Sequence, residues 1–251
     1  MQVRTVTVLR RTVRLPMRLA LLHRELAVGT PVRFVGAAGT DALVDVATGA
    51  GFAVTACDAR GLDVVRARTL ADTVGPGMRV LVCGLNPSIY AADAGVGFAR
   101  PGNRFWPAAL AAGLVSVDRD PRHALETDAV GMTDLVKRAT VAAAELSRDE
   151  YRNGFDRVER LVEWLRPGAV CFVGLDGWRA AVNWRAVTGW QSERIGGTPT
   201  YVMPSTSGLN ARTSLADLTT HLRTALRAAE VSRPLPPAAS RAYRGSHGTN
   251  G

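Results

Sequence analysis

Short apolar runs alternate with amphipathic segments along the middle of the 251-residue chain. Three of these runs, RVLVCGL, AVCFVG and TYVMP, are typical of strands that are buried on both faces of a parallel sheet. Helical spacing of apolar positions predicts helices over 104–112, 149–165 and 178–184, and a last helix that opens at Ser214 and Asp217 with the spacing of a capping box. This alternation predicts an α/β protein, a three-layer α/β/α sandwich with a largely parallel central sheet.

The first part of the chain has a different pattern. A strand is predicted over 32–35, a helix over 41–48 and a second strand over 52–57, which together make a small βαβ-like appendage. Its turn, GAAGT, lacks the GxGxxG pattern, so the sequence favours a structural appendage over a dinucleotide site. A short helix is predicted over 64–72, in the connector that ends at Gly75-Pro76-Gly77.

The same patterns divide the chain into four parts. We expect a basic N-terminal tail over 1–18, the appendage and connector over 19–75, the main α/β domain over 76–230, and a tail over 231–251 whose composition is typical of disorder.

The net charge of +9 is unevenly distributed. Residues 1–18 carry five arginines and residues 231–251 carry three, with no acid in either segment, which leaves +1 for residues 19–230. Basic tails add non-specific, salt-sensitive affinity for phosphate or serve only to solubilise the ends. Overall charge therefore does not by itself make this a DNA-binding protein.

The cysteines and histidines give no metal or disulfide pattern. Cys57, Cys83 and Cys171 each sit in an apolar, strand-like segment without a CxxC motif, so we expect core cysteines in a reducing compartment. The four histidines are scattered away from the candidate site loops. No apolar run is long enough for a membrane helix and no signal peptide is evident, so we expect a soluble, cytoplasmic protein without metal or cofactor.

Two unusual loops follow predicted strands, and in parallel sheets ligands bind beyond the carboxyl ends of the strands. The first, 84–103, carries Asn86-Pro87 directly after a strand and Phe98 after a glycine. Asn86 either makes a simple turn or orients a water molecule through its amide. Phe98 is either a hydrophobic plug or a flat surface on which a planar ligand stacks.

The second loop, within MPSTSGLNAR (203–212), places a single apolar residue, Leu209, among small and polar ones. It either packs inward where the last helix begins or acts as a wedge between bases. Ser205 and Ser207 offer hydroxyl and backbone N–H groups to a phosphate. A further segment, 131–140 (GMTDLVKRAT), is predicted to be a loop, and its Asp134 is either a surface or capping residue or a catalytic carboxylate.

Taken together, GLNPSIYAADAGVGFARPGNRFW, GMTDLVKRAT and MPSTSGLNAR resemble, in this order and spacing, the mismatch-specific uracil/thymine DNA glycosylases of the uracil-DNA glycosylase superfamily. The resemblance covers roughly 76–228 and not residues 1–75. It implies metal-independent hydrolysis of the N-glycosidic bond of uracil, thymine or a related base mispaired with guanine in double-stranded DNA, after the nucleotide flips out of the duplex.

The resemblance also implies roles for single residues. Asn86 matches the asparagine that positions the water, Phe98 the aromatic on which the base stacks, and Leu209 the wedge. Further positions match the family's base pocket and DNA-contacting loop: Leu85, Pro87 and Ser88 in the pocket, and Ser205, Ser207, Gly208, Asn210 and Arg212 toward DNA.

The chain departs from the family pattern at two positions. Ser88 stands where many members have glycine, which leaves the base preference open, and Asp134 stands where members vary. We hypothesise that Asp134 supplements Asn86 by favouring a cationic transition state. The alternatives are a catalytically inactive DNA- or nucleotide-binding protein and a nucleosidase acting on free nucleosides, which would not need Leu209. We expect a monomer.

Overall fold

The computed structural model describes residues 4–7, 12–36 and 41–231. The N-terminal unit consists of β1 (Arg4–Thr7), α1 (Leu15–Glu25), β2 (Pro31–Val35), α2 (Asp41–Gly49), β3 (Phe52–Asp58) and β4 (Gly61–Arg66). The second unit begins with β5 (Val80–Gly84), α3 (Ile89–Ala94), α4 (Phe105–Ala112), α5 (Pro121–Glu126) and β6 (Val130–Asp134). It continues with the short 3₁₀ helix η1 (Ala143–Glu145), α6 (Arg148–Leu165), β7 (Ala169–Val173), α7 (Leu175–Ala181), β8 (Gly189–Trp190), β9 (Thr200–Met203) and α8 (Leu215–Val231).

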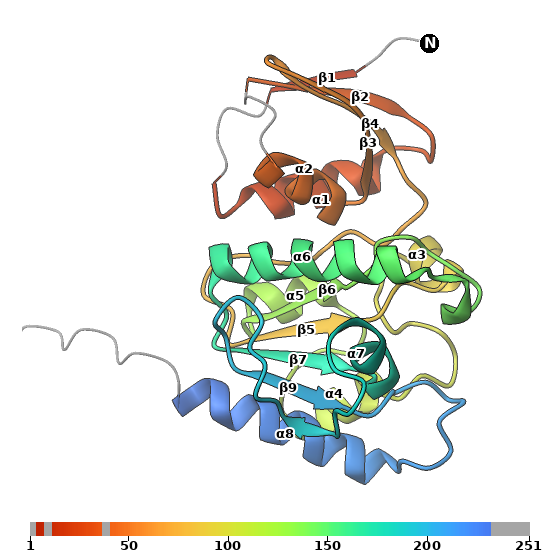
Figure 1. Cartoon of the computed structure of the whole chain (residues 1–251), viewed down its shortest axis with the longest axis vertical. Helices are drawn as coiled ribbons and strands as arrows, with labels where there is room; N and C mark the ends of the chain where they lie inside the picture. Colours follow the sequence, from red (N-terminus) through yellow and green to blue (C-terminus); the bar gives the residue numbers. More distant parts are fainter. Residues whose placement is uncertain (1–3, 8–11, 37–40, 232–251) are drawn as a thin grey trace, which may run out of the picture.

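The second unit is built on a five-stranded sheet in the order β6-β5-β7-β9-β8. The first four strands are parallel, and only the edge strand β8 runs antiparallel to its neighbour. The arrowheads of β5, β7 and β9 therefore point to one side, where the loops that follow them gather (Figure 1).

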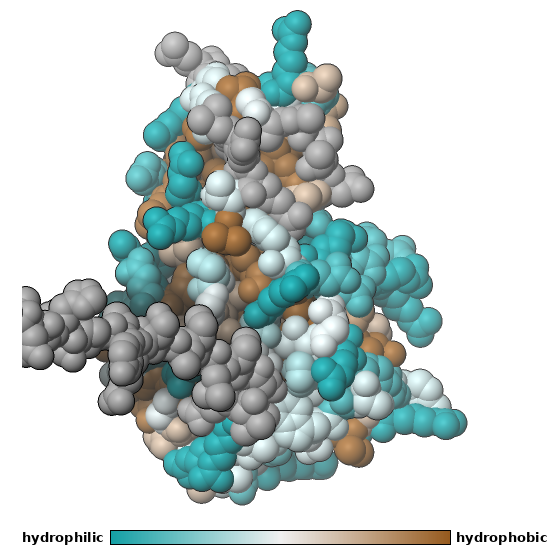
Figure 2. Space-filling view, turned by 90° about the vertical axis from the view of Figure 1, so that its left-hand side faces the viewer, coloured by the Kyte–Doolittle hydropathy of each residue, from teal (hydrophilic) through white to brown (hydrophobic). Residues whose placement is uncertain are grey.

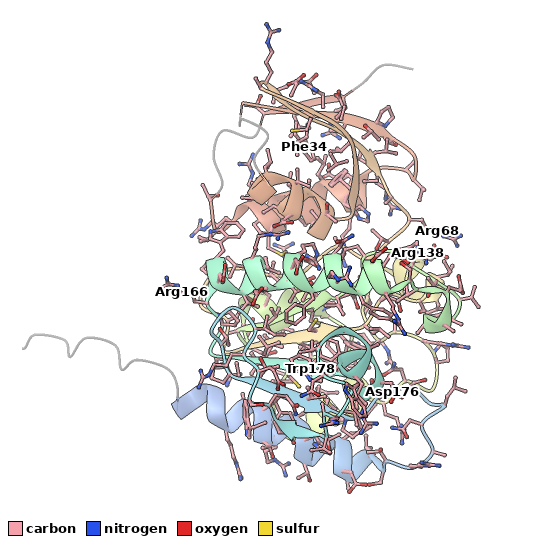
Figure 3. All side chains as sticks on the ribbon, in the orientation of Figure 1. Phe34, Arg68, Arg138, Arg166, Asp176 and Trp178 are labelled. Atoms are coloured by element: carbon pink, nitrogen blue, oxygen red, sulfur yellow. The ribbon has the colours of Figure 1, made fainter. Side chains whose placement is uncertain are left out.

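The two faces of this sheet are covered by different helices. Val80 and Val82 of β5 pack in a cluster with residues of α4 and α8, whereas Leu81 and Cys83 pack in a second cluster with α6 and α7. Figure 3 shows Trp178 of α7 beside the sheet. This period-two alternation on a strand buried on both faces confirms the predicted three-layer α/β/α sandwich.

The N-terminal unit has its own sheet, in the order β1-β2-β4-β3, and its own core. β4 is antiparallel to both β2 and β3 and lies between them. Phe34 of β2 is fully buried between this sheet and helices α1 and α2 (Figure 3). The predicted strand, helix and strand of the appendage are thus present, but two further strands flank or separate them.

The short helix predicted over 64–72 is wrong. Leu62 and Val64 alternate with more exposed residues in β4 and point into the core, which is a strand pattern. The Asp58 carboxylate accepts the backbone N–H groups of Arg60 and Gly61 and so forms the hairpin turn. A Cβ on Gly61 would lie 1.8 Å from the carbonyl oxygen of Phe34, so only glycine fits at this position.

Three other expectations differ from the structure. Val130–Asp134 form the buried strand β6, so 131–140 is a loop only from Leu135 onward. In the segment expected to be a tail, Arg4–Thr7 pair with β2 and α1 already begins at Leu15, with Pro16 at its first turn. Cys57 is exposed, because β3 turns that part of its surface to solvent, whereas Cys83 and Cys171 are buried as expected. The tail expected over 231–251 lies, apart from Val231, outside the described residues.

A buried charge cluster binds the connector to the second unit. Asp72, in the connector, binds Arg157 of α6 (Nη1–Oδ2 2.8 Å) and Lys137 (Nζ–Oδ1 2.7 Å), and all three side chains are buried. Thr133 of β6 donates to the same carboxylate at 2.8 Å. Burial alone would raise the pKa of Asp72, but the charges of Arg157 and Lys137 outweigh burial and hold that pKa below its usual range.

The described helices include none that is long and apolar enough to cross a membrane. Figure 2 views the end opposite the strand arrowheads, where hydrophilic and hydrophobic residues are interspersed over the described surface.

The charge cluster leads to a stability prediction. Asp72→Ala leaves two buried cations without their carboxylate, which should lower the free energy of unfolding by about 3–5 kcal/mol. Asp93→Ala is the matched control, because it breaks an ion pair with Arg68 in which both side chains are about half exposed, and it should change stability little. Urea unfolding of both variants measures the difference. Equal losses in the two variants would contradict this assignment.

Candidate active site

A pocket of about 240 Å³ opens beyond the carboxyl ends of the parallel strands. Its lining comes from the segments after β5, β6 and β9, and includes Leu85, Asn86, Pro87, Ser88, Phe98, Asp134, Thr140, Ser205 and Ser207. The structure thus brings together the predicted pocket residues and two of the predicted DNA-loop residues.

Asn86 is held in one orientation by its amide nitrogen. Nδ2 donates to the Thr140 hydroxyl at 2.7 Å, to the carbonyl of Arg138 at 3.0 Å and to that of Pro87 at 3.2 Å. Among the described residues, none donates to Oδ1. The side chain therefore presents an acceptor to the pocket, which is what orienting a water molecule requires.

The segment 135–140 is bound along the Asn86 turn by backbone hydrogen bonds. The N–H groups of Leu135 and Val136 donate to the carbonyls of Gly84 and Leu85, and Thr140 exchanges bonds with Pro87 and Ile89. Thr140, the last residue of the motif GMTDLVKRAT, therefore fixes the side chain of Asn86. The sequence position of Thr140 alone did not indicate this role.

Ser88 caps helix α3. Its hydroxyl accepts the backbone N–H of Ala91 at 3.1 Å, and its backbone is extended, as an N-cap requires. The side chain still lines the pocket, but its oxygen is already engaged in capping.

Phe98 has a left-handed backbone, with φ of 57°, which is costly for a residue with a side chain. Its ring stacks on Phe105, with centroids 4.3 Å apart, and it also lines the pocket. The preceding carbonyl, of Gly97, accepts a hydrogen bond from the fully buried Trp106 at 2.8 Å. The core thus holds a strained turn that keeps an aromatic ring in the pocket wall.

Asp134 ends β6 and is buried, with 8% of its surface exposed. A Cβ on Gly84 would lie 2.5 Å from its Oδ1, so glycine at position 84 leaves the room for this carboxylate. No described residue donates a hydrogen bond to its side chain. Burial raises the pKa of Asp134 to about 6, with a further increase from Asp72 and opposing effects of Lys137 and Arg157. A buried carboxyl with a free face toward a pocket is a candidate catalytic group.

The loop after β9 is held by one arginine. Arg104 donates to the carbonyls of Asn210 (2.6 Å), Ser207 (3.2 Å) and Thr213, and its backbone N–H donates to Thr206. A Cβ on Gly208 would lie 2.9 Å from the carbonyl oxygen of Gly102, so the two site loops touch at this point.

Leu209 stands at the tip of this loop with 87% of its surface exposed. It does not pack inward, which removes the alternative of a core residue where the last helix begins. Asn210 uses its side chain to bind Ser205 and Thr213, and its backbone groups bind Ser207 and Arg104. Among the described residues, the N–H of Gly208 has no acceptor.

The basic residues near the site are fewer than the sequence suggests. Lys137 is paired with Asp72, Arg138 with Glu150, and Arg104 supports the loop. Figure 3 shows Arg138 near the start of α6. Of the five cations in or beside the site loops, Arg100 and Arg212 are exposed, and neither guanidinium group has a hydrogen-bond or ion-pair partner among the described residues.

Two functional positions were not found from sequence. Asp72 and Leu70 both belong to the connector, and Leu70 lines the pocket although it lies before the first motif. No local pattern marks either of them. Within the described residues, no group of three His, Cys, Asp or Glu side chains is placed to hold a metal ion.

The pocket lies at the carboxyl end of a parallel sheet and contains a fixed amide, a free carboxylate and an aromatic wall. These features are typical of an α/β protein with an enzyme-like site. A family model described as the Uracil DNA glycosylase superfamily matches residues 71–230. The chain belongs to this superfamily, whose members are DNA glycosylases, and the membership indicates uracil DNA glycosylase activity.

A comparison with solved structures matches the chain to a solution NMR structure from Methanosarcina acetivorans of a protein provisionally named uracil DNA glycosylase. The two share 22% sequence identity over 65% of this chain and 98% of that chain, with a TM-score of 0.46.

The environment of Asp134 leads to a pH prediction. Its pKa is raised from 3.8 to about 6 in the folded state. The stability linked to this proton is therefore fully present below pH 3.8 and is lost as pH rises through about 6. Asp134→Asn should abolish this loss. As pH rises from about 4 to about 7, the free energy of unfolding of this variant should therefore gain on the order of 3 kcal/mol relative to that of the parent protein.

Urea unfolding across this pH range measures the effect. Asp149→Asn, at an exposed carboxyl on α6, is the control and should follow the parent protein. A constant difference between Asp134→Asn and the parent at all pH values would contradict the assigned environment.

Proposed function

We propose that the protein is a monofunctional glycosylase that removes uracil, thymine or another damaged pyrimidine from mispairs with guanine in double-stranded DNA. One observation carries the proposal. The free acceptor Oδ1 of Asn86 and the free carboxylate of Asp134 line the same pocket. The proposed domain, 76–230, acts as a monomer in the cytoplasm without metal or cofactor.

In the proposed reaction, the flipped uracil stacks on Phe98, which forms the aromatic wall of the pocket. The bond between C1′ of the sugar and N1 of uracil breaks first, so uracil departs as its N1 anion and leaves a cationic sugar. A water molecule held by Oδ1 of Asn86 then forms the new bond to C1′ and yields an abasic site.

Asp134 stabilises the cationic sugar. Above pH 6 its carboxylate is mostly ionised, so a negative charge in a poorly solvated position favours the developing positive charge. The same carboxylate takes the proton that the attacking water releases, and so balances the reaction.

The exposed tip of the 205–212 loop contacts the DNA. Leu209 fills the space that the flipped nucleotide leaves, and the free N–H of Gly208 addresses the unpaired guanine. Ser205 and Ser207 contact phosphates, Arg212 adds charge, and Asn210 shapes the loop through its internal hydrogen bonds. The exposure of Leu209 favours this function over a nucleosidase, because a free nucleoside leaves no gap to fill.

The catalytic assignment is tested by single-turnover base release from a G·U duplex. Asn86→Ala should lower the rate by about 10²-fold or more, because the water loses its orienting acceptor. Asp134→Asn should lower the rate at neutral pH and remove the inflection near pH 6 from the pH–rate profile.

Asn153→Ala, at an exposed asparagine of α6, is the control and should retain full activity. Binding of the G·U duplex by Asn86→Ala should persist. If the parent protein binds the duplex without releasing base, the inactive binding protein is the correct alternative.

The wedge role of Leu209 is tested by comparing rates on double-stranded and single-stranded DNA. Leu209→Ala should lower the rate on a G·U duplex by roughly tenfold or more, because unstacking a base step costs a few kcal/mol that the wedge helps to offset. The rate on single-stranded uracil DNA should stay the same, because no base stack has to be opened. Val187→Ala, at another exposed apolar residue, is the control. An equal loss on both substrates would refute the wedge role.

A further inference from the structure

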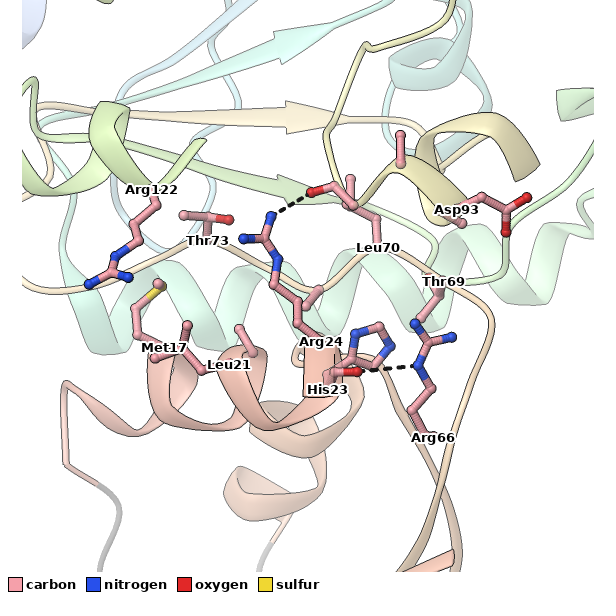
Figure 4. Close-up of a pocket in the computed structure, with 15 residues that line it drawn as sticks. Met17, Leu21, His23, Arg24, Arg66, Thr69, Leu70, Thr73, Asp93 and Arg122 are labelled. Atoms are coloured by element: carbon pink, nitrogen blue, oxygen red, sulfur yellow. Dashed lines mark hydrogen bonds between the residues drawn. The ribbon is translucent and has the colours of Figure 1, made fainter. Parts of the chain in front are cut away.

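A second cavity lies between the two units. It has a volume of about 330 Å³, and its wall comes from α1, the connector, the end of α3 and the start of α5. Figure 4 shows Leu70, Thr69 and Thr73 of the connector among its lining residues, with Met17 and Leu21 of α1. We call this cavity the interdomain cleft.

The connector segment 69–73 has a fixed course. The Thr69 hydroxyl donates to the carbonyl of Lys137, and Asp72 is held by Lys137 and Arg157. Thr73 exchanges two backbone hydrogen bonds with Met132 of β6, at 2.8 and 2.9 Å. The backbone on both sides of Leu70 is therefore bound to the unit that carries the candidate active site.

Leu70 separates two spaces. Its side chain lines the interdomain cleft, the 240 Å³ pocket and a small cavity of about 10 Å³ between them. That small cavity is also lined by Phe98 and Asp134, so it adjoins the part of the pocket where the base would stack. A Cβ on Gly97 would lie 3.4 Å from Cδ2 of Leu70, which shows that Leu70 packs directly against the Phe98 turn.

We propose that Leu70 is a specificity-determining residue, which closes the base pocket on the side of the interdomain cleft and limits the size of the pyrimidine that the enzyme accepts. The inference rests on the proposed function, and it adds a residue from outside the part of the chain that the family model matches, 71–230. The ligand class concerned is uracil with alkyl substituents at C5.

The chemistry of the wall supports this role. An aliphatic side chain between two anchored residues cannot move away without breaking buried contacts, so it resists an added methyl or ethyl group. In an apolar wall, one methylene typically changes discrimination by about 10- to 200-fold. Shortening Leu70 to alanine would join the pocket to the small cavity and the cleft behind it.

The test compares single-turnover release of uracil, 5-methyluracil and 5-ethyluracil, each opposite guanine, from the same duplex. In Leu70→Ala, the ratio of the 5-ethyluracil rate to the uracil rate should rise by about tenfold or more. In Leu70→Phe, the same ratio should fall. Leu21→Ala is the matched control, because Leu21 lines the interdomain cleft but not the pocket, and it should leave the ratio unchanged.

The possible outcomes separate the two proposals. Base release by the parent protein, with the same ratio in the parent, Leu70→Ala and Leu70→Phe, would overturn the role of Leu70 and leave the proposed function standing. No release of any base by the parent protein would overturn the proposed function, and the role of Leu70 with it. Thermal melting of each variant identifies any that fail to fold. Leu70→Val, which removes one methylene, then replaces that variant and should raise the ratio of the 5-ethyluracil rate to the uracil rate, whereas an unchanged ratio would overturn the role of Leu70.

Discussion

The buried carboxylate of Asp72 is the contact that fixes the connector against the unit that carries the candidate active site. It joins the connector to α6 through Arg157 and to the site segment through Lys137. Arg157 also donates to the backbone carbonyl of Asp134 at 2.6 Å, so the same cluster fixes the end of β6 where the catalytic carboxylate is proposed. The connector is therefore a support for the site, and the charge of Asp72 also raises the pKa of Asp134.

The pocket illustrates how a stable core supports unfavourable local states. Phe98 keeps a left-handed backbone because Phe105 stacks on its ring and Trp106 binds the preceding carbonyl. Asp134 keeps a poorly solvated carboxylate without a donor from the described residues. Each state costs stability, and each presents to the pocket a group that hydrolysis of a glycosidic bond can use.

Much of this architecture could be predicted from sequence, and the rest could not for physical reasons. Buried parallel strands are continuous apolar runs, so β5, β7 and β9 were evident. The end of β4 falls within the helix predicted over 64–72, because Val64 and Val65 fit either period. The polar residues of β6 conceal a strand buried on both faces. The partners of Asp72 lie 65 and 85 positions away, and no local pattern reveals such pairings.

A crystal structure with DNA tests the central claim most directly. The duplex would carry 2′-fluoro-2′-deoxyuridine opposite guanine, because the electronegative fluorine opposes the cationic transition state and leaves the bond intact. The account predicts uracil outside the duplex, stacked on Phe98, with Leu209 in the gap and a water between Oδ1 of Asn86 and C1′. Uracil still paired within the duplex, or bound away from this pocket, would contradict the account.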